Sequence, residues 1–330
     1  MENRFDFEIQ KLKKELKKRK AKRILIQLPE GIKKEALKIK KELNDLNLEI
    51  FFSGESCFGG CDISINEAKL LKVDLIVHFG HTKFINVNFP IIYIPIKDLV
   101  DLTPLLKKSI NELKDYKKIG LSSSIQHLHK IKEIKNFYEK NKKKVILSKK
   151  EGLVAYEGHI VGCQYKGLKS IEKKVDCFII VGNQFHALGA AISLEKPVFL
   201  LDVYNKEIKN MEELKKKIIL QRIKSIEEFK KAEKIGLIIS TKTGQNFYSL
   251  EKIKQKLKEN KKDFIIITMN EITPEKIMNF YDVEAFVELS CPRIAIDDFS
   301  KYQKPILTFK ETLLALNNKK IDELFEEGFI

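Results

Sequence analysis

The chain has 330 residues, 43% of them apolar, and it carries a formal net charge of +16. This length supports two or three domains of ordinary size with buried cores. The apolar runs, such as residues 198–201 and 264–267, are far shorter than the roughly 20 residues of a membrane helix, which argues against a membrane-spanning protein. The first 20 residues are too charged for a secretory signal, so we expect a cytoplasmic location.

The positive charge lies along Lys-rich stretches such as 215–217 and 252–258, as is typical of solvated helix faces. Aromatic residues do not alternate with the basic runs, and no known RNA-binding signature is present. We therefore expect no direct contact with nucleic acid.

The predicted elements follow the same order three times along the chain. The first third has three buried-type strands, ILIQLP after Arg23, LIVHFG after Asp74 and IIYIP after Pro90. The second third repeats them as IGLSSS after Lys118, FIIVGN after Cys177 and VFLLD after Pro197. The last third has IGLIIS after Lys234, AFVELS after Glu284 and ILTFK after Pro305. A Lys- and Glu-rich helical pattern follows each opening strand, for example Leu250, Ile253 and Leu257.

Continuous apolar strands that alternate with amphipathic helices indicate parallel sheets covered on both faces. We expect three Rossmann-like α/β domains in a pseudo-threefold arrangement, over residues 1–112, 113–230 and 231–330. Two larger domains are an alternative. Because ligands of such sheets bind beyond the carboxyl ends of the strands, the loops there are the expected site.

Five cysteines are dispersed over the chain, which is unlike a secreted disulfide framework. Cys61, Cys163 and Cys291 lie one in each third, in polar loops that lead toward helical patterns. The pattern predicts a helix from Asp62 onward, whose N-terminus would stabilise a Cys61 thiolate. Cys177 lies within a strand and reads as a buried apolar residue, while the role of Cys57 is open.

A closed zinc site has four ligands and usually contains C-x-x-C pairs. The three distant cysteines supply only three ligands and no such pair. An iron–sulfur cluster with one iron open to substrate suits them better. The histidines at 78, 81, 127 and 129 have no carboxylate partner at a fixed helical spacing, so we interpret them as polar residues at strand ends.

Several runs resemble the archaeal 2-(3-amino-3-carboxypropyl)histidine synthase family of diphthamide biosynthesis. They are GGCD at residues 59–62, DLIVHFGHT at 74–82, VGCQ at 161–164, IVGNQFHALG at 180–189, TKTGQ at 241–245 and LSCPRIAIDD at 289–298. The resemblance implies a homodimeric transferase that binds one 4Fe-4S cluster through Cys61, Cys163 and Cys291. It also implies that the reduced cluster cleaves S-adenosylmethionine and that the aminocarboxypropyl group is joined to a histidine of translation elongation factor 2. An electron donor is then required.

Three further residues are assigned to S-adenosylmethionine binding through this resemblance, namely Gln245, Arg293 and Asp297. The planar fork of Arg293 suits the carboxylate of the cosubstrate, and Asp297 either holds that arginine or accepts from the amino group. A surface ion pair between Arg293 and Asp297 on one helix is the alternative.

Two other functions compete with this one. Quinolinate synthase, a dehydratase, also has three α/β units and three cysteines on a 4Fe-4S cluster. A Lys-rich RNA-binding or assembly protein with structural thiols is the non-enzymatic alternative.

Overall fold

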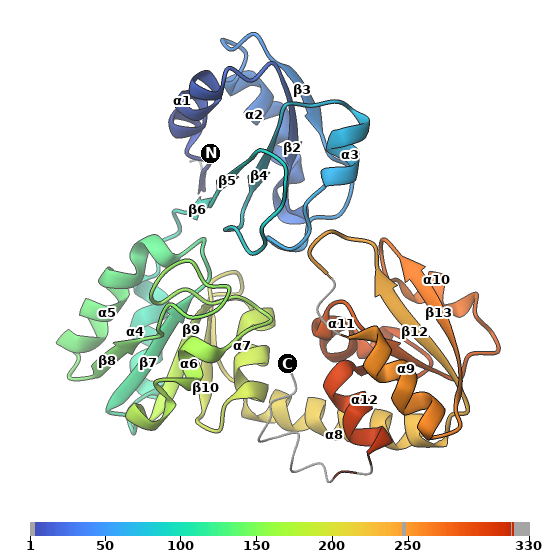
Figure 1. The fold of residues 1–330 in the computed structure, drawn as a ribbon. Coiled ribbons are helices and arrows are strands. Elements are labelled where there is room, and N and C mark those ends of the chain that lie inside the picture. Colours follow the sequence, from blue (N-terminus) through green and yellow to red (C-terminus); the bar gives the residue numbers. More distant parts are fainter. Residues whose placement is uncertain (1–3, 246–248, 318, 320–330) are drawn as a thin grey trace.

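Three β-sheets organise the computed structural model, which describes residues 4–245, 249–317 and 319. In Figure 1 they form three lobes, the first blue, the second green and the third orange to red. Each sheet contains four parallel strands in the same order: the second strand along the chain, then the first, the third and the fourth. The prediction of an α/β chain with parallel sheets is confirmed.

The first sheet has the order β3-β2-β4-β5. Its strands are β2 (Arg23–Gln27), β3 (Glu49–Phe52), β4 (Leu75–Phe79) and β5 (Ile91–Ile94). The accompanying helices are α1 (Ile9–Arg19), α2 (Ala36–Glu42) and α3 (Ile65–Leu70). Leu25 belongs to a core on one face of this sheet, while Ile24 and Ile26 belong to a core on the other. Burial on both faces explains why the three central residues of β2 are all apolar.

The second sheet has the order β8-β7-β9-β10-β11, and its last strand is antiparallel. Its strands are β7 (Lys118–Ser123), β8 (Lys144–Leu147), β9 (Cys177–Gly182), β10 (Val198–Asp202) and β11 (Glu207–Asn210). The helices are α4 (Thr103–Glu112), α5 (Ile131–Lys140), α6 (Lys166–Lys169) and α7 (Gln184–Ser193). A short antiparallel pair, β1 (Phe5–Asp6) and β6 (Lys97–Asp98), lies near the junction with the first lobe.

The third sheet has the order β13-β12-β14-β15. Its strands are β12 (Lys234–Ser240), β13 (Asp263–Met269), β14 (Ala285–Glu288) and β15 (Ile306–Thr308). The helices are α9 (Leu250–Glu259), α10 (Pro274–Met278), α11 (Pro292–Asp297) and α12 (Phe309–Leu316). Short 3₁₀ turns complete the described elements at η1 (Glu30–Glu35), η2 (Leu128–Lys130), η3 (Glu172–Lys174) and η4 (Phe299–Lys301).

The long helix α8 (Glu212–Lys231) joins the second and third lobes (Figure 1). Its residues Ile218 and Ile226 belong to one apolar core with Leu200 of the second sheet and Leu237 of the third. Arg222 is buried on the same helix and binds Glu311 of α12 through two contacts of 2.7 Å. These two lobes therefore share a core. The predicted ranges 1–112, 113–230 and 231–330 remain a prediction, and their residues 1–3, 246–248, 318 and 320–330 lie outside the described part.

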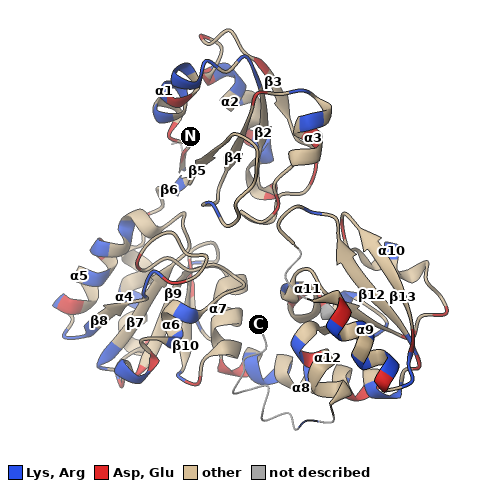
Figure 2. Ribbon diagram, in the orientation of Figure 1, with Lys and Arg blue, Asp and Glu red and all other residues tan. Residues whose placement is uncertain are grey.

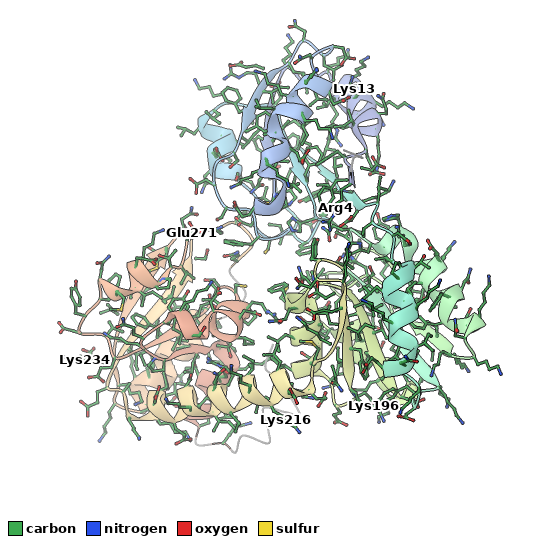
Figure 3. The ribbon with its side chains drawn as sticks, turned by 180° about the vertical axis from the view of Figure 1, so that it is seen from behind. Arg4, Lys13, Lys196, Lys216, Lys234 and Glu271 are labelled. Atoms are coloured by element: carbon green, nitrogen blue, oxygen red, sulfur yellow. The ribbon has the colours of Figure 1, made fainter. Side chains whose placement is uncertain are left out.

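Many Lys and Arg residues lie on outer helices such as α1, α5, α8 and α9 (Figure 2). Figure 3 shows the molecule from behind, with Lys13, Lys196 and Lys234 at its periphery. Arg4 lies where the first and second lobes meet. Arg4 pairs there with Asp98 at 2.8 Å and packs over the ring of Tyr204. The excess positive charge is therefore largely that of solvated helix faces. No helix in the described part of the chain is long and apolar enough to cross a bilayer.

Candidate metal centre

The three predicted cysteines lie in loops beyond the carboxyl ends of strands, as expected for parallel sheets. Cys61 lies between β3 and α3, and Cys163 lies between β8 and α6. Cys291 instead follows β14 and forms the N-cap of α11. Cys61 and Cys163 thus follow the second strand of their sheets along the chain, whereas Cys291 follows the third strand of its sheet.

Electrostatics indicate that the three thiols lie close together. Burial, and after it the neighbouring Cys163 thiol, raise the pKa of Cys61 to about 12. Burial, then Glu288, and then the other two cysteines hold the pKa of Cys291 well above its usual value. The influence of the three thiols on one another's pKa indicates that loops from three sheets, 102 and 128 residues apart along the chain, lie near one another.

The expected helix after Cys61 begins later than predicted. Asp62 lies in a turn, where its N–H donates to the carbonyl of Gly59 at 2.9 Å, and α3 starts only at Ile65. No helix N-terminus therefore supports the Cys61 thiolate, and the prediction of a thiolate stabilised in this way is wrong. A bound cation is needed to offset the burial that keeps this thiol protonated.

The loop after β12 packs directly against the Cys61 loop. A Cβ on Gly244 would lie 2.4 Å from the carbonyl oxygen of Cys61, so only glycine permits this approach. The side chain of Gln245 lies close enough to Cys61 to lower the pKa of its thiol against the stronger effect of burial. Gln245 therefore lies near Cys61, and its role in binding stays a prediction.

A buried ion pair joins the same two loops. Lys242 Nζ lies 2.6 Å from Asp62 Oδ2 and donates to Ser56 Oγ at 2.9 Å. The side chains of Lys242 and Asp62 are only 6% and 7% exposed, and the ammonium group also lies over the ring of Phe58. The pair fixes the residue next to Cys61 to the third lobe.

Arg293 connects α11 to the second lobe. Its Nη2 donates to Asp297 Oδ1 and to the carbonyl oxygen of Phe185, both at 2.6 Å, and its guanidinium stacks on the Phe185 ring. Its Nη1 reaches the hydroxyl of Tyr165 only at 3.4 Å. Arg293 is 3% exposed, so its pair with Asp297 is not a simple surface ion pair. The charge of Arg293 also lowers the pKa of Cys163 against the stronger effect of burial, which indicates that the two lie near each other.

Glycine at position 189 permits this arrangement on the side of the second lobe. A Cβ there would lie 1.8 Å from the Tyr165 hydroxyl and 2.1 Å from Arg293 Nη1. A larger residue in this turn of α7 would displace both groups.

Glu288, at the end of β14, shapes the loop that carries Cys291. Its Oε1 accepts hydrogen bonds from the N–H groups of Ser290 and Cys291 at 2.6 and 2.7 Å. Burial raises the pKa of this carboxyl group to about 7. The carboxyl group therefore holds the backbone of Cys291 in place through these two hydrogen bonds.

The spacing of the cysteines bears on which metal they suit. Among the described residues, Cys57, His78 and His81 form a group whose ligand atoms all lie within 4.8 Å of one another, whereas the three loop cysteines do not form such a group. Thiolates on one tetrahedral ion, with bonds of about 2.3 Å, lie roughly 4 Å apart. Thiolates of an iron–sulfur cluster bind separate irons and lie farther apart. Because these three sulfur donors do not all lie within 4.8 Å of one another, they fit a cluster better than a single ion.

The sequence did not indicate the roles of several residues near the cysteines. Lys242, Asp62, Tyr165 and Glu288 are ordinary polar residues whose partners are distant in sequence. His78 Nδ1 lies 3.0 Å from Gln27 Oε1, and His78 Nε2 lies 3.0 Å from His81 Nδ1. The interpretation of the histidines as ordinary polar residues is wrong for His127, which is buried with no hydrogen-bond partner at either ring nitrogen.

Comparison with known proteins shows the family. Residues 28–325 match the family described as "Putative diphthamide synthesis protein". The chain belongs to this family. The chain is 33% identical to the 2-(3-amino-3-carboxypropyl)histidine synthase of Pyrococcus horikoshii over 95% of its own length and 91% of that protein. It is 30% identical to the synthase of the same name from Methanocaldococcus jannaschii, covering 93% and 89% of the two chains.

A solved structure agrees with this assignment. The crystal structure of Dph2 from Pyrococcus horikoshii with a 4Fe-4S cluster has a TM-score of 0.86 and 32% identity, covering 96% of this chain and 92% of that one. The resemblance inferred from the cysteine-containing runs is confirmed, and the chain is an enzyme of the aminocarboxypropyl transferase class. The quinolinate synthase and RNA-binding alternatives are set aside.

Proposed function

We propose that this enzyme transfers the 3-amino-3-carboxypropyl group of S-adenosylmethionine to a histidine of translation elongation factor 2, the first step of diphthamide biosynthesis. Cys61, Cys163 and Cys291 would hold one 4Fe-4S cluster, and the electrostatic influence of these thiols from three sheets on one another is the observation that supports the proposal. We further propose that the three lobes are related by a pseudo-threefold axis, because their sheets share one strand order.

The cluster would supply the electron that breaks the S–Cγ bond of the cosubstrate. The chain's own part is to bind and orient that molecule. Arg293 Nε lies 2.5 Å from Asp297 Oδ2, and Nη2 donates to the carbonyl oxygen of Phe185 at 2.6 Å. Nη1 makes only a long contact of 3.4 Å with the Tyr165 hydroxyl. We assign Nη1 to the carboxylate of the cosubstrate, and Asp297 holds the guanidinium in place.

Gln245 and Asp297 complete the proposed binding site. Gln245 Oε1 accepts from Ser240 Oγ at 3.2 Å, which fixes the amide beside Cys61. Asp297 is only 23% exposed, and the stacked ring of Phe185 limits the access of water to the guanidinium. Limited water access strengthens the charge pairing that orients the cosubstrate.

The reaction is tested by incubating anaerobic, reduced, cluster-loaded protein with S-adenosylmethionine and measuring methylthioadenosine. The product should form with the unchanged chain and with Cys177→Ala, and it should disappear with Cys291→Ala. Adding elongation factor 2 should then move labelled aminocarboxypropyl group onto that protein. An intact cluster that yields no methylthioadenosine would contradict the proposed reaction, and cleavage without transfer would contradict the proposed substrate.

Two partners follow from the family resemblance alone. We propose that the enzyme works as a homodimer and that a separate electron donor reduces the cluster.

A further inference from the structure

A second group of metal-type ligands lies in the first lobe and does not include Cys61, Cys163 or Cys291. Cys57 is in the loop after β3, His78 is in β4, and His81 follows that strand. One ligand atom from each lies within 4.8 Å of the others. Cys57 is 3% exposed and His78 is fully buried, whereas His81 is partly exposed. The group therefore lies at the carboxyl edge of the first sheet with one member open toward solvent.

The side chain of Gln27 sets the orientation of the first imidazole. Its Nε2 donates to the carbonyl of Asp62 at 2.7 Å, so its Oε1 faces the other way and accepts from the N–H of Ser64 at 3.3 Å. His78 Nδ1 lies 3.0 Å from the same oxygen and must therefore carry the proton. The lone pair of His78 is thereby left on Nε2.

This Nε2 atom faces the second imidazole. It lies 3.0 Å from His81 Nδ1, which is near the roughly 3.3 Å that separates two nitrogens on one tetrahedral ion with bonds of about 2.0 Å. A histidine whose other nitrogen is held by an oxygen acceptor is the usual arrangement of a metal ligand. A hydrogen bond between the two imidazole rings would also give this N–N distance. It would not account for the Cys57 thiol beside them.

We propose that Cys57, His78 and His81 bind a zinc-type divalent ion, separately from the three loop cysteines. Two imidazoles and a thiolate are donors that zinc accepts and that magnesium and calcium do not favour. The described residues supply three ligands, so the fourth position is left to water or another small ligand.

The location indicates what the ion does. Cys57 lies four residues before Cys61, and Gln27 is bonded to the carbonyl of the residue after Cys61. The ion therefore anchors both sides of the loop that carries Cys61, and this role does not depend on which reaction the enzyme performs.

The site is tested on full-length, cluster-loaded protein that is exposed to zinc and then desalted. Elemental analysis should find one zinc in addition to the four irons of the cluster. Cys57→Ala and His81→Gln should keep the irons and lose the zinc, and Cys177→Ala, which removes another buried cysteine, should keep both. X-ray absorption at the zinc edge should find one sulfur at about 2.3 Å and two nitrogens at about 2.0 Å.

Three outcomes would overturn the proposal. They are the absence of zinc in the unchanged protein, retention of zinc by Cys57→Ala, and loss of iron by Cys57→Ala, which would make Cys57 part of the cluster site. If Cys57→Ala does not fold, His81→Gln decides, because His81 is partly exposed and its replacement leaves the core intact. Because zinc and iron are counted separately, failure of this site leaves the proposed reaction untouched.

Discussion

Replacing Lys242 by Met tests whether the third lobe holds the Cys61 loop in place. The substitution keeps the length of the side chain but leaves Asp62 buried without its cation, since the two charged groups are 2.6 Å apart and at most 7% exposed. Removing one partner of a buried pair costs about 3–5 kcal/mol. The exposed pair of Lys254 and Glu251 is the matched control, and Lys254→Met should cost less than about 1 kcal/mol.

The assay is urea unfolding of the iron-free chain, followed by far-UV circular dichroism because the chain contains no tryptophan. The double variant Lys242→Met with Asp62→Leu should recover most of the loss, because replacing both partners of a buried pair is often close to neutral. The reasoning fails if Lys242→Met costs no more than Lys254→Met, or if the double variant is as unstable as the sum of the two single ones.

Three other changes have defined outcomes. Gly244→Ala introduces a methyl group 2.4 Å from the Cys61 carbonyl, so we expect lower iron retention in anaerobic iron assays; unchanged retention would contradict the close packing. Arg222→Met leaves the carboxylate of Glu311 buried and unpaired, so unfolding in urea should need about 3–5 kcal/mol less free energy, and a loss below 1 kcal/mol would refute this. Burial lowers the pKa of His159 to about 4, below the unfolded value of about 6.5, so its contribution is present above pH 6.5 and is lost as the pH falls toward 4. The loss amounts to at most about 3 kcal/mol, and His159→Gln should make urea stability less dependent on pH over this window.

Much of the fold was predictable because the inner strands are buried on both faces. Strands such as Lys118–Ser123 and Cys177–Gly182 are apolar runs bounded by polar residues, and the proline before Val198 marks a strand start. The prediction missed β3, β8 and β13, which lie at the same edge position of the three sheets and are only partly buried. It also missed that α8 belongs to the cores of two lobes, since helical periodicity does not indicate which sheet a helix covers.

The sequence indicated three cysteines as metal ligands, which stays a prediction, but it did not indicate the residues around them. Cys61, Cys163 and Cys291 were singled out by their loops, whereas the helix expected after Asp62 begins three residues later because Asp62 turns inward to meet Lys242. That partner is 180 residues away, and no local pattern indicates such a contact. The position of Tyr165 beside Arg293 likewise depends on packing between lobes.

The central claim is that one cysteine from each sheet holds a single cluster. The most direct test is iron and sulfide analysis, with Mössbauer spectra, of anaerobically reconstituted protein carrying single alanine replacements. The account predicts a full 4Fe-4S cluster in the unchanged chain and in Cys177→Ala, and a lost or degraded cluster in Cys61→Ala, Cys163→Ala and Cys291→Ala. An undamaged cluster in any of these last three variants would contradict it.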